Sequence, residues 1–177
     1  SAGFTHWAKL NNLKQAAKTM NFLTEHGISS YGELESKLTA VSARRDTAHA
    51  EIKRIESRSA ELALVMKHAG TYRQLKPLYE RYRKSNDKEK FLRGHESEII
   101  LFEAAARELK RLGTVPLPTT ESMKTELANL NAEKERLLAE YKAARAEAQE
   151  YETVKQNVDA LLTVAKEQEQ QRRHELE

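Results

Sequence analysis

Between residues 30 and 85, apolar and small side chains recur at alternating steps of four and three, which is the spacing of a heptad repeat. Two polar residues, Arg45 and Ser59, stand at positions of the same series. The series is Leu34, Leu38, Val41, Arg45, Ala48, Ile52, Ile55, Ser59, Leu62, Met66 and Ala69. A pattern of this kind predicts a long helix that packs along a partner helix.

A second heptad series follows a break at Pro116 and Pro118, two prolines that no helix accommodates at that spacing. It contains Met123, Leu127, Leu130, Lys134, Leu137, Tyr141, Ala144, Ala148, Tyr151, Lys155, Val158, Leu162 and Ala165. The fold predicted from the two series is all-α, a long antiparallel helical hairpin resembling a coiled coil. If the connection is symmetric, Ala69 lies beside Lys134 and Ala48 beside Lys155.

The residues between and before the two long helices predict a helical tip and an N-terminal helix packed at the open end of the hairpin. The first helix is expected over residues 5–26, with Gly27 as its C-terminal cap. Its apolar stripe is Trp7, Leu10, Leu13, Ala17, Met20 and Leu23, and Phe4 and Trp7 are interpreted as packing residues. The predicted segments are 1–3 (a cloning remnant), 4–27, 28–85 (first arm), 86–118 (tip and proline linker) and 119–177 (second arm, with a tail from Gln168 that frays).

Local signals place the ends and interruptions of these helices. Ser30 and Glu33 form a capping box that starts the first arm, and Thr119 is an N-cap for the second. Gly70 and Pro77 predict a kink or break near the end of the first arm. Gly94 and Gly113 are expected to delimit the helices of the tip.

Composition agrees with long helices, since charged residues make up 32% of the chain and aromatic residues only 6%. The absence of cysteine excludes disulfides and thiolate metal sites, and is typical of proteins from a reducing cytosol. The chain contains no apolar run long enough to span a bilayer, so no membrane partner is expected. The six histidines are scattered, and no glycine-rich phosphate loop is present. We therefore expect neither enzymatic activity nor a small-molecule substrate, metal or cofactor in this chain.

Charge is concentrated between Lys67 and His95, where nine basic and three acidic residues give a net charge of +6. Lysine and arginine bind phosphates, so this segment is the candidate DNA-binding site. Its proposed DNA-binding residues are Arg73, Lys76, Arg81, Arg83, Lys84, Lys88, Lys90 and Arg93. Tyr79 and Tyr82 could stack on unpaired bases. The alternative is that Tyr72, Tyr79, Tyr82 and Phe91 form the core of the tip, and that the cations are only solvated.

Several short strings resemble the region that follows the nuclease domain in relaxases, the mobilisation nucleases of conjugative and mobilisable elements in Firmicutes-type bacteria. They are residues 7–23 (WAKLNNLKQAAKTMNFL), 79–84 (YERYRK), 90–96 (KFLRGHE) and 117–124 (LPTTESMK), and residues 127–158 resemble the closing helix of the same family. The resemblance implies a bacterial cytoplasmic protein and a DNA-nicking whole protein. The nucleophilic tyrosine and histidine cluster of that family belong to the nuclease domain, so no catalytic residue is expected here.

Two functions follow as hypotheses. In the first, the chain is a non-catalytic accessory module of a relaxase that binds or positions DNA through its basic tip during plasmid or transposon mobilisation. In the second, the hairpin is a coiled-coil arm that forms a homodimer or links the nuclease to relaxosome or coupling proteins. Polar residues in the heptad series would then set register or partner choice, namely Arg45, Ser59, Lys134 and Lys155.

Overall fold

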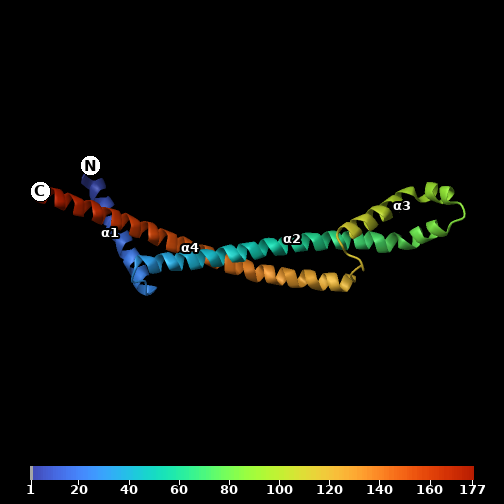
Figure 1. Ribbon diagram of the computed structural model, residues 1–177, viewed down its shortest axis with the longest axis horizontal. Coiled ribbons are helices and arrows are strands. Elements are labelled where there is room, and N and C mark those ends of the chain that lie inside the picture. The colour runs from blue at the N-terminus through green and yellow to red at the C-terminus, as the bar shows by residue number, and fades with distance from the viewer. Residues whose placement is uncertain (1) are drawn as a thin grey trace. The chain divides into compact units, whose positions relative to one another are not determined.

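The computed structural model describes the backbone of residues 2–177 and the side chains of residues 11–177, and the described chain is helical with no strand. Its helices are α1 (Ala2–Glu25), α2 (Tyr31–Lys84), α3 (Lys88–Arg111) and α4 (Thr120–Leu176) (Figure 1). The predicted all-α class is confirmed. The predictions for Ser1 and for the side chains of Phe4, Trp7 and Leu10 lie outside the described residues.

The chain divides into two compact units. Unit 1 combines Ser1–His49 with Leu138–Glu177, and unit 2 is Ala50–Leu137. Each unit contains a segment of α2 and a segment of α4, so the same heptad packing occurs in both.

Two glycines end helices in the manner that the sequence predicts. Gly27 and Gly113 have φ angles of 62° and 68°, in the left-handed region where other residues are strained. After α1, the Ile28 amide donates to the Leu23 carbonyl (2.9 Å) and the Gly27 amide to the Thr24 carbonyl (3.2 Å). The same pair of bonds follows α3, so both helices end in a Schellman motif.

The start of α2 is fixed by the predicted capping box, extended by one residue. The Ser30 hydroxyl accepts a hydrogen bond from the Glu33 amide at 3.1 Å. The Glu33 carboxylate reaches back to Ser29, whose amide and hydroxyl donate to Oε2 at 2.8 and 3.0 Å. At the start of α4, the Thr119 hydroxyl accepts from the Ser122 amide at 3.1 Å, as predicted for an N-cap.

In unit 1, the first part of α2 runs antiparallel to α4. The Tyr31 hydroxyl donates to Asp159 at 2.6 Å, and Arg44 pairs with Glu147 at 2.6 Å, so ascending positions on α2 meet descending positions on α4. α1 closes the start of this unit, where Phe22 and Leu23 lie against the core. The buried core of this end is Ile28, Leu34, Val41, Ala148, Tyr151 and Val154.

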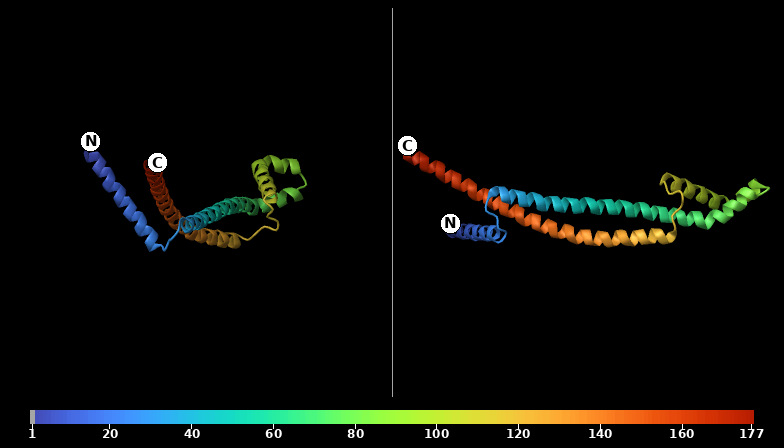
Figure 2. Two further views of the ribbon diagram at one scale, coloured as in Figure 1. Left: turned by 60° about the vertical axis from the view of Figure 1, so that its left-hand side comes forward. Right: turned by 60° about the horizontal axis from the view of Figure 1, so that its bottom comes forward.

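In unit 2, α2 packs against α4 and then against α3. Arg58 donates to both carboxylate oxygens of Glu126, and Lys134 pairs with Glu56 at 3.3 Å, again in antiparallel order. Beyond the start of α4, α3 folds back along the end of α2 (Figures 1 and 2). The buried core of the unit is Ile52, Ile55, Leu62, Val65, Ala69, Ile99, Phe102, Ala105, Leu109, Met123, Leu130 and Leu137.

The predicted register of the two long helices is wrong. Lys134 lies beside Glu56 rather than Ala69, and the Lys155 ammonium lies 5.8 Å from the ring of Tyr31 rather than beside Ala48. The cause is an asymmetric connection within unit 2. Arg73 donates to the Thr120 hydroxyl at 2.9 Å, so α4 begins beside Arg73, and residues 74–84 of α2 extend past it to pack on α3.

The predicted apolar face of α1 is wrong at Leu13, Ala17 and Met20, which are exposed, and right at Leu23, which packs against the core. Leu13 and Met20 are 67% and 58% exposed, whereas Thr19 is buried. The packed face consists instead of Thr19, Phe22, Leu23 and His26, because these residues meet α4. The Asn157 amide donates to the Thr19 hydroxyl at 3.3 Å, and the Phe22 ring meets Tyr151 edge to face at 5.1 Å.

The seam on α4 is shorter than predicted. Leu162 is 48% exposed and Ala165 is exposed, because α2 begins at Tyr31 and its partner Asp159 marks the end of the antiparallel contact. The tail that the sequence predicted to fray is helical as far as Leu176, with every side chain from Ala160 onward exposed.

Two predicted interruptions have different outcomes. α2 continues as one helix through Gly70 and Pro77, and it bends in its C-terminal part (Figure 2). Phe102 of α3 stacks on rings before and after Pro77, at 4.9 Å from Tyr72 and 4.2 Å from Tyr79, which supports the helix across the missing hydrogen bond. The predicted break in the tip is present, since His95 leaves helical geometry at φ −138° and ψ 24°.

Removal of the Ile55 side chain tests the seam of unit 2. Ile55 is fully buried, and Ile55→Ala is expected to lower the free energy of unfolding by about 2–5 kcal/mol through lost burial and a residual cavity. Leu64, on the same helix, is 43% exposed, and Leu64→Ala is expected to cost less than about 1 kcal/mol. Urea unfolding followed by circular dichroism measures both. Equal losses would contradict the assigned seam.

Glu33 gives the cap a pH dependence. The Ser29 amide and then the Ser29 hydroxyl lower the pKa of Glu33 below its ordinary 4.5. The ionised carboxylate therefore stabilises the fold above pH 4.5, and this stabilisation is lost as the pH falls through the lowered pKa. Glu33→Gln is expected to lower the thermal midpoint at pH 7, and the difference from wild type is expected to shrink as the pH falls below 4.5 and through the lowered pKa.

The matched control is Glu35→Gln. Glu35 is exposed and lies two residues after Glu33, so the substitution removes the same charge outside the cap. It is expected to show no such convergence in melting curves recorded across the same pH series. A Glu33→Gln difference that persists unchanged in acid would refute the capping role of the carboxylate.

Candidate nucleic-acid interface

The candidate interface lies in unit 2, where the end of α2, a short turn and the start of α3 meet. We call this region, residues 73–93, the basic tip. The turn at residues 85–87 is held by side chains: the Ser85 hydroxyl accepts from the Asp87 amide at 3.3 Å, and Asp87 Oδ1 accepts from the Lys90 amide at 3.1 Å. Asp87 is the N-cap of α3 and completes the turn from one helix into the next.

A continuous set of ring contacts fills the space between α2 and α3 in the basic tip. The ring centroids of Tyr79 and Tyr82 lie 5.8 Å apart, and those of Tyr82 and Phe91 lie 6.0 Å apart. Phe91 contacts His95 at 4.7 Å, and Phe102 stacks on Tyr79 at 4.2 Å. The rings of Tyr72, Tyr79, Tyr82 and Phe91 are half-buried, so they form the core of the tip. Of the two alternatives for these aromatic residues, the packing role is therefore observed, and a base-stacking role for Tyr79 and Tyr82 stays a prediction.

The eight predicted DNA-binding residues surround these rings, and every one is exposed. Within the described part of the chain, none has a carboxylate within 4 Å of its charged group. Elsewhere in unit 2, Arg54, Arg58 and Arg111 each pair with a glutamate. The charges of the eight cations of the basic tip are not offset by ion pairs of this kind.

Aromatic rings position two of these cations. The Arg81 guanidinium lies 5.7 Å from the ring centroid of Phe91, and the Lys76 ammonium lies 5.9 Å from that of Tyr72. Because Arg81 is on α2 and Phe91 on α3, the first contact joins the cations of the two helices in one surface. Contacts of this kind orient a cation without cancelling its charge.

Arg73 differs from the other seven in its hydrogen bonds to the proline linker and α4, whereas Arg93 donates to the Glu89 carbonyl within α3. The Arg73 guanidinium donates to the Pro118 carbonyl and to the Thr120 hydroxyl, which ties the proline linker and the start of α4 to α2. Arg73 is therefore a structural link within unit 2, and its availability to an outside anion is lower than that of Arg83 or Lys84, for which no internal hydrogen bond is present.

His95 lies at the kink of α3, behind Phe91. Its Nδ1 atom is buried without a hydrogen-bond partner and is 3.8 Å from the Glu98 carboxylate. Sequence reasoning placed the break at Gly94, and the geometry that departs from helix is that of His95. The Glu98 carboxylate forms an ion pair with His95 only when the imidazole is protonated.

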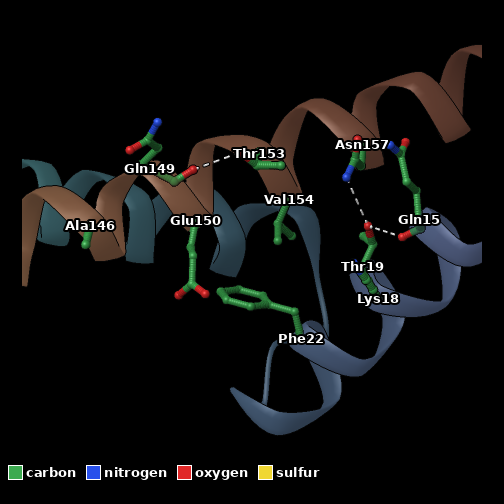
Figure 3. Close-up of a pocket in the computed structure, with 10 residues that line it drawn as sticks. All are labelled: Gln15, Lys18, Thr19, Phe22, Ala146, Gln149, Glu150, Thr153, Val154 and Asn157. Carbon is green, nitrogen blue, oxygen red and sulfur yellow. Dashed lines mark hydrogen bonds between the residues drawn. The ribbon is translucent and has the colours of Figure 1, made fainter.

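A hollow that the sequence does not predict lies in unit 1, between α1 and α4. It has a volume of about 640 Å³ (Figure 3). Thr19 stands at its edge, where its hydroxyl donates to the Gln15 carbonyl at 2.9 Å and accepts from Asn157. The spacing of Thr19, Phe22 and Leu23 with His26 on α1 was the available signal, and the more apolar Leu13 and Met20 stripe obscured it.

The described residues contain no group of three histidine, aspartate or glutamate side chains able to hold a metal ion. Nor does any helix over the described residues have the length and apolar character needed to cross a membrane. The exposed ammonium and guanidinium groups of the basic tip are able to bind an anion.

Comparison with known proteins identifies no relative: no protein family, no curated protein and no solved structure matches this chain.

Proposed function

We propose that this chain is a non-catalytic helical module that binds DNA through its basic tip, as an accessory region of a relaxase acting in the mobilisation of a plasmid or transposon. The relaxase part of the proposal is supported by the sequence strings described above. The DNA-binding part is supported by the surface of unit 2.

The observation that carries the proposal is the exposed charge of the basic tip. Eight lysine and arginine side chains lie there without a carboxylate partner among the described residues. A cluster of like charges repels itself, and an anion that binds across it removes that repulsion. DNA supplies such an anion, because its phosphates follow one another at regular spacing and release counterions when lysine or arginine neutralises them.

The three cations at the end of α2 test the proposal. The variant Arg81→Ala, Arg83→Ala, Lys84→Ala is expected to bind DNA at least about tenfold more weakly at 50 mM salt, because up to three phosphate contacts are lost. The slope of the logarithm of affinity against that of salt is expected to become shallower by about 2 to 3. Fluorescence anisotropy with a labelled 20-base-pair duplex measures both quantities.

The matched control removes three exposed cations from unit 1, in the variant Lys142→Ala, Arg145→Ala, Lys166→Ala. It changes the net charge by the same amount, so its affinity is expected to stay within about threefold of wild type if the basic tip is the site. Circular dichroism of both variants verifies the helical fold. Undetectable binding by the wild type at low salt, or equal losses in the two variants, would refute the proposal.

The alternative function is a dimerisation or docking arm that joins the nuclease to relaxosome or coupling proteins. The observation in its favour is a group of exposed apolar side chains on α1 and α4 of unit 1: Leu13, Met20, Leu161, Leu162 and Val164. The polar seam residues weigh less, since Lys134 and Lys155 pair within the chain with Glu56 and Asp159. Light scattering distinguishes the two functions: a concentration-dependent dimer without DNA affinity supports docking, and a DNA-binding monomer supports the first proposal.

A further inference from the structure

The ring contacts of the basic tip bear on which form of DNA it binds. Proteins that bind single strands without sequence preference combine a cationic surface with aromatic faces on which successive bases stack. In the basic tip, the rings are engaged with one another. Phe102 lies between Tyr72 and Tyr79, and Phe91 contacts Tyr82 and His95 and has the Arg81 guanidinium over it.

We infer that the basic tip binds double-stranded DNA through its phosphate backbone, in preference to single strands. This inference rests on the proposed function and deepens it. The lysine and arginine side chains of this surface are exposed, whereas the rings that would hold unpaired bases are half-buried and in contact with one another. A ligand that presents phosphates outward and keeps its bases stacked inside therefore fits the surface better than one with exposed bases.

The placement of the cations supports the same conclusion. Residues 73–84 cover about 17 Å along the axis of α2, at about 1.5 Å per residue. One strand of a duplex presents a phosphate about every 3.4 Å along its axis, so about five phosphates face a segment of this length. The turn that joins α2 to α3 is held by the Ser85 and Asp87 hydrogen bonds, so the two helix ends that carry the cations have a fixed arrangement. A duplex matches it without ordering a flexible strand.

Charge density gives the size of the expected preference. For about five phosphate contacts, the logarithm of affinity falls with that of salt with a slope of about −4.5 on a duplex and about −3.5 on a single strand. Between 1 M and 50 mM salt this difference in slope amounts to about a twentyfold gain for the duplex. We expect at least that preference at 50 mM salt, because stacking adds nothing on the single strand.

The experiment compares a 20-base-pair duplex with the 20-nucleotide single strand of the same sequence, using the full chain and fluorescence anisotropy across a salt series. Tighter binding and a steeper slope on the duplex support the inference. Equal or tighter binding of the single strand overturns it while leaving the proposed function intact. Absence of binding to both DNAs refutes the proposed function itself.

A ring variant separates phosphate binding from stacking. Tyr82→Leu keeps an apolar side chain in the half-buried position and removes the ring, and Tyr141→Leu does the same for a half-buried tyrosine of unit 1. Both variants are expected to bind the single strand within about threefold of wild type. A loss of about tenfold or more on the single strand but not on the duplex for Tyr82→Leu, with Tyr141→Leu unchanged, would show that bases stack on this ring and would overturn the inference.

Discussion

In each unit, the structure depends on the burial of a narrow apolar seam between antiparallel segments of α2 and α4. Small residues in that seam are completely enclosed: Ala144 and Ala148 in unit 1 and Ala69 in unit 2 have no exposed surface. Larger side chains such as Leu34 and Ile55 are also enclosed, so large and small side chains together fill the space between two helices. A two-helix seam has no deeper interior, and its stability comes from the number of such positions rather than from a central core.

The unequal lengths of the paired segments create the basic tip. Because α4 starts beside Arg73, the last residues of α2 have no α4 partner, and their rings at Tyr79 and Tyr82 would be left in water. α3 folds back and supplies Phe91 and Phe102 to cover them. This packing leaves the aromatic rings half-buried, and the lysine and arginine side chains between them are exposed. Packing and charge presentation are thus two results of the same arrangement.

The sequence predicted what depends on neighbouring residues and missed what depends on distant ones. The caps at Gly27, Ser30, Gly113 and Thr119 were predicted because each is determined within about four residues. The register was not, because a heptad pattern is nearly unchanged when one helix slides by two repeats, and the displacement of Lys134 from Ala69 to Glu56 is close to that distance. Only the packing of α3 on the end of α2, which no local pattern encodes, selects between such registers.

The same distinction applies to the candidate interface. Its cations could be named from sequence because long charged side chains on a short turn and helix ends are exposed almost regardless of tertiary detail. The special position of Arg73 could not, since its guanidinium is engaged by Pro118 and Thr120, far along the chain. Nor could the sequence decide between packed and exposed rings, because the spacing of Tyr72, Tyr79 and Tyr82 fits both. The contacts of Phe102 and Phe91 show that the rings pack against one another, and the exposed lysine and arginine side chains remain as groups that can bind phosphate.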